Sequence, residues 1–138
     1  MSTPRLLVLA ALLLSAACYT SPKPEVYAPA LSPNGVHGVL HLRTGAEAAG
    51  ELLEVRENAY VLLINDRVTV VPFTTIASGT FEHQDWMSFG SVASPNAGTR
   101  QRLRWDSRFP FGMRDPAMAA LLRAGNQAEP DVVNGGKQ

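Results

Sequence analysis

Three histidines are the first residues to consider, because imidazole is a common ligand of zinc and related metal ions. His37 and His41 fall on the same side of an alternating segment, but four strand residues separate them by about 13 Å. His83 lies far along the chain, between Glu82 and Gln84, and no convincing third ligand accompanies these residues. A zinc site needs three or four converging ligands. We therefore expect solvated histidines, no bound metal and no cofactor.

Candidate nucleophiles and acid–base residues lack the neighbours that catalysis requires. The chain has no Gly-x-Ser-x-Gly motif, and Ser88 in the stretch MSFGS lacks the required flanks. Glu51, Glu54 and Glu57 are spaced as surface residues of a strand and its turn, and nothing identifies a buried carboxylate pair. A glycine-rich phosphate loop is also missing from the sequence. These patterns favour a protein that is not an enzyme.

Arginines at alternating positions form the most strongly charged feature. In TRQRLRWDS, residues 99–107, a strand would place Arg100, Arg102 and Arg104 on one face, about 7 Å apart. Between residues 100 and 123, six arginines face two acidic residues. Such a row suits lipid phosphates, lipopolysaccharide or an acidic partner. The default alternative is an edge strand whose charges prevent aggregation.

A second possible contact surface lies in residues 77–93, where aromatic residues occur without clear periodicity. A long irregular loop in a small domain is either functional or a misread hairpin. Phe81, Trp86 and Phe89 are candidates for a binding lip. The alternative, which we adopt as the working expectation, is a flap that closes the apolar core.

The only cysteine, Cys18, follows a leader with the features of an export signal. Arg5 precedes an apolar run at residues 6–14, and small residues follow at 15–17. That run is shorter than the roughly 20 residues of a helix that spans a bilayer. The stretch LSAAC, residues 14–18, resembles a bacterial lipobox in which Ser15 stands where leucine is usual.

This resemblance implies cleavage after a signal peptide at residues 1–17, acylation of Cys18 with two or three chains such as palmitate, and anchoring in the bacterial envelope. The residue directly after the cysteine is Tyr19 and not aspartate. Among lipoproteins of this kind, the absence of aspartate at that position favours anchoring in the outer membrane, with the protein facing the periplasm. An ordinary signal-peptide cut at the same position would instead release a soluble periplasmic or secreted protein. Four prolines make residues 18–34 an extended tether.

Removal of residues 1–17 leaves 11 basic and 12 acidic side chains, and this balance indicates no affinity for nucleic acid. The remaining length fits one domain. A single cysteine cannot form an internal disulfide, so the apolar core must hold the fold together.

Residues 35–125 predict a mainly β domain. Val36, Gly38, Leu40 and Leu42 alternate with polar residues as in a half-buried strand. Further strands are expected at 49–56, 59–64, 67–71 and 99–107, with tight turns at 57–58 and 65–66. A short helix should follow, with Asp115 as N-cap, Pro116 in its first turn and Gly125 just past its end. Residues 126–138 are expected to form a flexible tail.

The stretch from Gly38 to Ile76 resembles small SH3-like or Sm-like barrels, in which a glycine-bounded turn and bent strands lead to a Pro-x-x-x-Ile exit. The resemblance implies five to six strands in a barrel or meander with one short C-terminal helix. The RNA-binding signatures of the Sm family, Asp-x-x-Asn and Arg-Gly, are missing. We therefore expect no RNA binding.

The leading functional hypothesis is a non-catalytic interaction or scaffold module, anchored to the membrane through Cys18 and bound to an envelope protein. The alternative is a domain that binds anionic lipid or a small ligand. In that case the contact residues would be Arg100, Arg102 and Arg104 with Trp86 and Phe89 of the aromatic loop at 81–89. The identity of the partner does not follow from the sequence.

Overall fold

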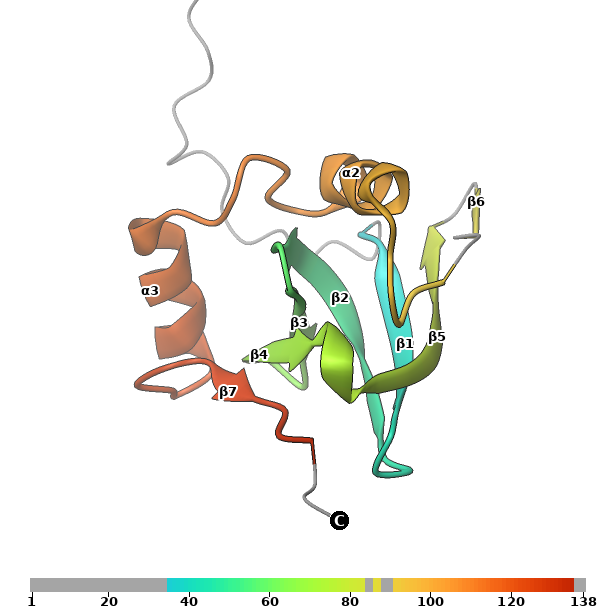
Figure 1. Cartoon of the computed structure of the whole chain (residues 1–138). Coiled ribbons are helices and arrows are strands. Elements are labelled where there is room, and N and C mark those ends of the chain that lie inside the picture. Colours follow the sequence, from blue (N-terminus) through green and yellow to red (C-terminus); the bar gives the residue numbers. More distant parts are fainter. Residues whose placement is uncertain (1–34, 84–85, 88–90, 136–138) are drawn as a thin grey trace, which may run out of the picture. The chain divides into compact units, whose positions relative to one another are not determined.

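The structure, a computed structural model, describes residues 35–83, 86–87 and 91–135. They form one curved sheet and two α-helices (Figure 1). In chain order the elements are β1 (His37–Leu42), β2 (Glu47–Val55), β3 (Ala59–Ile64), β4 (Arg67–Pro72), a 3-10 turn (Phe73–Thr75), β5 (Ile76–His83), β6 (Trp86–Met87), α2 (Ala97–Asp106), α3 (Asp115–Ala124) and β7 (Asp131–Val132). The leader, Cys18, the tether and Phe89 lie outside the described residues.

The sheet has the order β6-β5-β1-β2-β3-β4-β7, so its two edges do not pair and it stays open. All neighbouring strands are antiparallel except β4 and β7. The turn between β3 and β4 is tight because Asn65 and Asp66 both adopt positive φ, at 49° and 63°, which asparagine and aspartate tolerate better than most residues. The mainly β prediction is confirmed. Among the described residues the sheet has seven strands, of which β6 and β7 have only two residues each, and two α-helices are present, so the expected single helix is wrong.

β2 carries an irregularity that divides the apolar residues into two clusters. Its register against β3 shifts between Leu52 and Glu54. An uninterrupted alternation would place Val55 on the face of Leu53, but the bulge returns it to the face of Leu52. Leu52 and Val55 accordingly belong to the larger cluster, whereas Leu53 belongs to the other one.

The larger cluster fills the concave side of the sheet. Its centre is Tyr60, whose ring lies 4.7 Å from that of Phe73 and 4.8 Å from that of Phe81, measured between centroids. The Tyr60 hydroxyl donates a hydrogen bond of 3.0 Å to the carbonyl of Val92. Phe81 is fully buried in β5. Residues 77–83 therefore belong to a strand and not to an irregular loop, and the antiparallel pairing of β5 with β6 agrees with the alternative of a misread hairpin.

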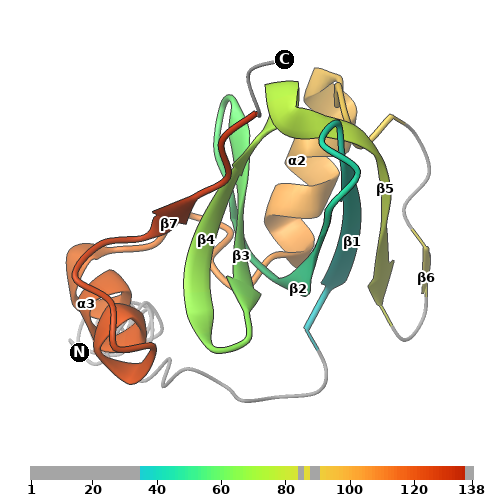
Figure 2. The same cartoon turned by 90° about the horizontal axis from the view of Figure 1, so that it is seen from below.

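The smaller cluster joins α3 to the outer face of the sheet. Leu121 of α3 packs with Leu53, Val61 and Val68. β3 is thus covered on both sides, as its uninterrupted apolar sequence predicts. The α3 prediction is confirmed, except that the N-cap is Arg114 and Asp115 is the first helical residue. Figures 1 and 2 show α3 beside β7, while α2 lies over one end of the curved sheet.

The segment after α3, where the sequence predicts a flexible tail at residues 126–138, contributes the short strand β7 (Asp131–Val132) to the sheet. The side chain of Gln127 imitates a neighbouring strand, because its amide both accepts from the N–H of Val68 and donates to its carbonyl. β7 then runs parallel to β4. Arg67 and Asp131 add two hydrogen bonds of 2.7 and 2.9 Å. This pairing begins with a single amide side chain, that of Gln127. A single side chain leaves no periodic pattern in the sequence, so the pairing could not be predicted from it.

Substitution of Tyr60 by phenylalanine tests the centre of the larger cluster. At neutral pH we expect a loss of about 1–2 kcal/mol of unfolding free energy, because the buried carbonyl of Val92 loses its donor. Burial raises the pKa of Tyr60 well above its ordinary value of 10.0, and the charge of Arg100 only partly opposes this. In the unfolded chain the same hydroxyl ionises near pH 10, so ionisation favours unfolding above that pH.

The stability advantage of wild type over Tyr60→Phe should therefore be constant below pH 9. Above pH 10 it should shrink by about 1.4 kcal/mol per pH unit. Urea denaturation of both proteins between pH 7 and 11 measures the difference and cancels the titration of all other groups. A difference that stays flat to pH 11 would contradict the burial of this hydroxyl.

Candidate functional site

The arginine-rich segment is a helix, so the predicted strand at residues 99–107 is wrong. α2 begins after Asn96, whose side-chain oxygen accepts a 2.8 Å hydrogen bond from the N–H of Thr99. This is the usual N-cap arrangement, which satisfies an N–H group that has no partner inside the helix. Leu103 alone is buried along α2. Asn96, as a favourable N-cap residue, was the signal in the sequence that could have indicated this helix. Because it also belongs to a Ser-Pro-Asn cluster that is typical of turns, the helix start was not recognised.

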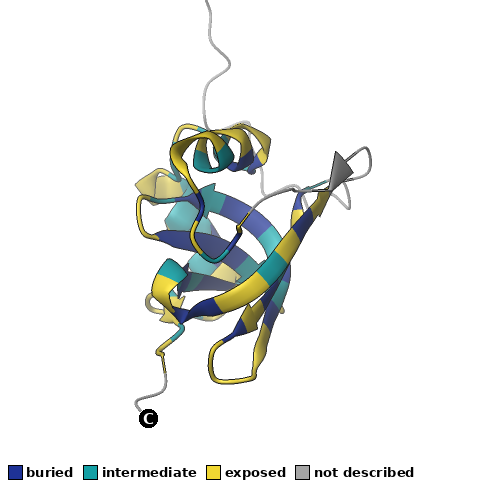
Figure 3. Cartoon of the chain, turned by 45° about the vertical axis from the view of Figure 1, so that its right-hand side comes forward, coloured by how far each residue is buried: buried dark blue, intermediate teal, exposed yellow. Residues whose placement is uncertain are grey.

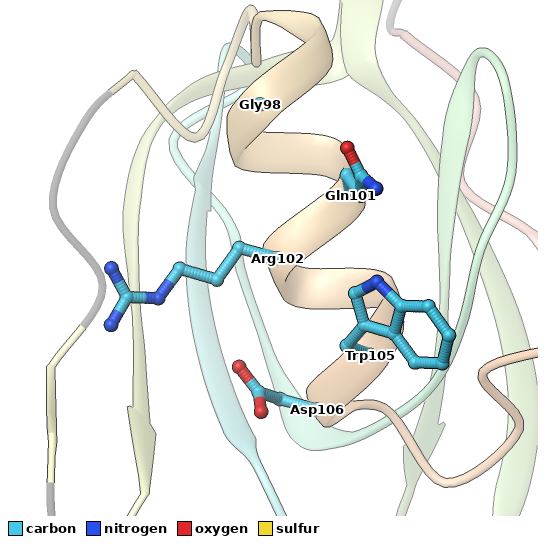
Figure 4. A pocket seen from close by; sticks show the side chains of 5 residues that line it. All are labelled: Gly98, Gln101, Arg102, Trp105 and Asp106. Atoms are coloured by element: carbon cyan, nitrogen blue, oxygen red, sulfur yellow. The ribbon is translucent and has the colours of Figure 1, made fainter.

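The helical geometry separates the three arginines. Residues four apart lie on the same face of a helix, and residues two apart lie on nearly opposite faces. Arg100 and Arg104 therefore line one groove together, while Arg102 lines a different hollow with Asp106. Figure 4 shows Arg102 and Asp106 on one side of α2 and Gln101 and Trp105 on the other. The three guanidinium groups do not form the continuous row that a strand predicts.

The larger depression is a groove of about 720 Å³ between α2, the β2–β3 turn and the turn at residues 108–112. We call it the α2 groove. Its lining combines aromatic rings with both signs of charge: Glu54, Val55, Arg56, Glu57, Ala97, Arg100, Gln101, Arg104, Trp105, Pro110, Phe111 and Gly112. Figure 3 shows that α2 is largely coloured as exposed or intermediate, whereas buried and exposed positions alternate along the strands.

Two exposed aromatic rings stand at the rim of the α2 groove. Trp105 is 60% exposed and Phe111 is 86% exposed. Their centroids lie 5.6 Å apart with the ring planes at 88°, an edge-to-face arrangement that aromatic pairs favour. The described residues contain only one other exposed large hydrophobic side chain, Val132 in β7. The pair therefore forms a compact apolar patch between α2 and the 108–112 turn.

Neighbouring groups hold the guanidinium groups in the α2 groove. Arg104 donates to the carbonyl of Val55 at 3.4 Å and to the carboxylate of Glu57 at 3.5 Å. Arg56 donates to Glu54 at 3.2 Å. A guanidinium has five N–H donors, and each of these contacts uses only one of them. The groove therefore presents N–H donors beside aromatic rings.

The 108–112 turn is fixed to β2 at the bulge. The N–H groups of Arg108 and Phe109 donate to the carbonyls of Leu52 and Leu53, at 3.2 and 2.9 Å. Arg108 also contacts Glu51 at 2.6 Å, and these side chains are only 10% and 19% exposed. These contacts determine the position of Phe111, two residues after Phe109.

A smaller hollow of about 490 Å³ lies on the outer side of α2 (Figure 4). It is lined by Gly98, Gln101, Arg102, Trp105 and Asp106. The hollow shares Gln101 and Trp105 with the α2 groove. Trp105 thus forms the ridge between the two depressions, so a ligand in either one would touch it.

The other predicted contact residues are not brought to this groove by any described contact. Trp86 belongs to β6, where its backbone pairs with His83 of β5. Its side chain, Phe89 and Cys18 lie outside the described part of the chain, so the choice between lip and flap stays open. Trp105, Phe111 and Arg56 were missed as site residues. The clustering of Trp105 with the aromatic stretch Phe109-Pro110-Phe111 was the available signal.

Within residues 35–83, 86–87 and 91–135, no group of three or more histidine, cysteine, aspartate or glutamate side chains is placed to hold a metal ion. No helix in these same ranges has the length and apolar character needed to cross a membrane.

The Glu51–Arg108 ion pair offers a test of how the groove is held. We expect Glu51→Gln and Arg108→Gln each to lower the unfolding free energy by about 2 kcal/mol, between the values for exposed and fully buried pairs. A double-mutant cycle by urea denaturation should give a coupling energy of about 1 kcal/mol, half of that loss. The matched control is Arg104 and Glu57, where Glu57 is 83% exposed. Equal coupling in the two cycles would show that Glu51 and Arg108 do not fix the turn.

The chain was compared with known proteins by family model, by sequence and by structure. No protein-family model, curated protein or solved structure matches it. The function must therefore be inferred from the geometry of the α2 groove and from the sequence.

Proposed function

We propose that this chain is an envelope lipoprotein whose domain is a non-catalytic interaction module. Cys18 carries the acyl chains that anchor it, in the outer membrane and facing the periplasm. More than one acyl chain gives firm anchoring, whereas one chain binds only marginally. The α2 groove is the surface that docks a protein partner in the envelope.

The finer fold assignment belongs to the same proposal. We assign the domain to the SH3-like or Sm-like small barrels, in an open form. The support is the strand order β5-β1-β2-β3-β4 and the 3-10 turn that follows Pro72 and leads into Ile76. This assignment concerns architecture alone, and it does not bring RNA binding with it.

The exposed pair of Trp105 and Phe111 is the observation that carries the functional proposal. Protein interfaces are enriched in aromatic residues and arginine at their centre. The α2 groove combines both, because Arg56, Arg100 and Arg104 line it beside the two rings. The Arg56 and Arg104 guanidiniums are already held by carboxylates, so less side-chain freedom is lost when a partner binds.

Anionic lipid is the second candidate, because six arginines occur between residues 100 and 123. The placement of the charges favours a protein instead. Arg102 lines the other hollow, and Glu54 and Glu57 stand among the groove arginines. Two carboxylates facing a lipid phosphate surface would oppose binding, whereas a protein partner can match both signs.

Site-specific photo-crosslinking tests the docking surface. We expect benzoylphenylalanine at position 111 to crosslink one defined protein in envelopes of the native host. The same probe at Val132, also an exposed hydrophobic residue, should not. Trp105→Ala should reduce the crosslink at least tenfold, by the loss of a central aromatic contact. Its effect on the unfolding free energy should stay below about 1 kcal/mol, since the ring is exposed.

Equal crosslinking at positions 111 and 132, or a crosslink that Trp105→Ala leaves intact, would contradict the docking surface. Vesicles provide the control for lipid. If the domain binds phosphatidylglycerol vesicles, if binding falls steeply from low to high salt, and if Trp105→Ala abolishes it, the lipid candidate replaces the protein partner.

The anchor has a separate test. Mass spectrometry of the mature N-terminal peptide from host membranes should find Cys18 carrying acyl chains. Cys18→Ser should move the protein from the membrane fraction to the soluble fraction. An unmodified Cys18 thiol at the mature N-terminus would contradict the anchor and leave a soluble exported domain. Mapping of the cleavage position alone does not decide this, because both cuts leave the same N-terminus.

A further inference from the structure

The arginines that line the α2 groove are not all matched by carboxylates. Arg56 donates to Glu54 at 3.2 Å, so these two charges balance. Arg104 donates to Glu57 at 3.5 Å in the same way. Arg100 forms no ion pair with any carboxylate in the part of the chain that the structure describes. The described lining therefore has one positive charge in excess, and this charge belongs to Arg100.

The surroundings of Arg100 suit a carboxylate from another molecule. The residue is half-buried in the lining of the groove, and its guanidinium donates to the carbonyl of Pro95 at 3.3 Å. A guanidinium has five N–H donors in a planar fork, and a carboxylate can accept from two of them at once. An ion pair at a half-buried position is also screened less by salt than one on an open surface. Arg100 is therefore placed to bind an acidic side chain.

The aromatic pair of the groove lies farther along the same helix. Arg100 and Trp105 are five residues apart, and a helix rises about 1.5 Å per residue, so their backbone positions differ by about 7.5 Å along its axis. Both residues line the groove, and Phe111 lies against Trp105 with 5.6 Å between the ring centroids. The groove thus offers a cationic position and an apolar position, about 7 Å apart.

An extended peptide chain presents its side chains at the same spacing. Alternate residues of such a chain point to the same side and lie about 6.6 Å apart. A carboxylate that binds Arg100 and an aromatic ring two positions away would therefore reach both parts of the groove together. The ring would extend the edge-to-face pair of Trp105 and Phe111, a geometry that aromatic groups favour. The residue between them would point away from the groove.

We propose that the α2 groove binds an extended segment of the partner protein in which an acidic and an aromatic residue are two positions apart. Arg100 binds the carboxylate, and the aromatic side chain packs on Trp105 and Phe111. This inference rests on the proposed function of the groove as a docking surface, and it names the chemistry of the segment that docks there. The two contacts do not fix the direction of the segment, so the test includes both orders.

The experiment is a titration of the protein with short synthetic peptides. The protein is the chain from residue 18 to residue 138 with Cys18→Ser, which prevents acylation. The reporter is the indole N–H of Trp105 in nitrogen-15 correlation spectra. The reference is the backbone N–H of Gly45, in the exposed turn between β1 and β2.

The peptides are blocked at both ends and consist otherwise of glycine and serine. Two of them carry glutamate and phenylalanine two positions apart, one in each order. Further peptides have glutamine in place of the glutamate, or alanine in place of the phenylalanine. We expect at least one of the first two to shift the Trp105 signal and to leave Gly45 unchanged. The glutamine and alanine peptides should each bind about tenfold more weakly, because each lacks one of the two contacts.

Substitution of the arginine tests which charge binds the carboxylate. Arg100→Gln should weaken binding of the glutamate peptide about tenfold and leave binding of the glutamine peptide nearly unchanged, because the two changes remove the same contact. The matched control is Arg102→Gln, which removes the same charge from the same helix but belongs to the lining of the other hollow. Its effect should stay within about twofold, because salt screens a charge that is not in contact.

Four results would overturn the proposal. The first is an unchanged Trp105 signal with every peptide at millimolar concentration. The second is equal binding of the glutamate and glutamine peptides to the wild-type chain, a comparison that holds even if Arg100→Gln does not fold. The third is equal weakening by Arg100→Gln and Arg102→Gln, which would show that the total charge of α2 attracts the peptide. The fourth is a Trp105 signal that changes with protein concentration alone, which would show that a second copy occupies the groove.

The crosslink from position 111 separates this proposal from the proposed function. A crosslink to an envelope protein that Arg100→Gln leaves intact would show that a partner docks in the groove without using this carboxylate. In that case the docking surface stands and the chemistry of the segment is wrong. If no crosslink forms at position 111, the docking surface itself is wrong, whatever the peptides do.

Discussion

The extra residue in β2 is the constraint on which the rest of the domain depends. Leu52 and Leu53 are adjacent in sequence and both fully buried, so one strand must serve apolar clusters on both faces of the sheet. The register shift between Leu52 and Glu54 makes this possible and returns Val55 to the concave side. Without it, Glu54 would face the apolar interior, where an unpaired carboxylate is costly.

The same irregularity positions the candidate site. The carbonyls of Leu52 and Leu53 accept hydrogen bonds from consecutive N–H groups of the 108–112 turn. The turn therefore attaches to β2 just beyond the point where the pairing of β1 with β2 ends. α2 is anchored nearby through Leu103 in the larger cluster. Trp105 and Phe111, six residues apart in sequence, meet because the two segments that carry them are fixed to neighbouring parts of one bent strand.

The predictable part of the fold is the part that local sequence determines. β1, β3 and β4 follow from alternation or apolar runs bounded by two-residue turns, and the left-handed Asn65-Asp66 turn matches its sequence signal. α2 was misread because Gln101, Leu103 and Trp105 alternate with arginines by chance, and only Leu103 is buried. The groove itself could not be predicted from the sequence. It is formed by β2, α2 and the 108–112 turn, and no local sequence pattern indicates that these segments are in contact.

The exposed residues of the α2 groove add little to the free energy of unfolding of the domain. Their substitution is therefore expected to alter the proposed binding surface without altering the fold. Trp105 and Phe111 are 60% and 86% exposed, and the ion pair of Arg104 with Glu57 is exposed, a setting in which such pairs stabilise proteins by about 0–1 kcal/mol. Arg108 and Glu51, a few residues away, are largely buried and hold the turn. Substitutions at the rim are therefore expected to cost less stability than substitutions of Glu51 or Arg108, which hold the turn beneath it. If the α2 groove is the docking surface that we propose, its rim can be altered without loss of the fold.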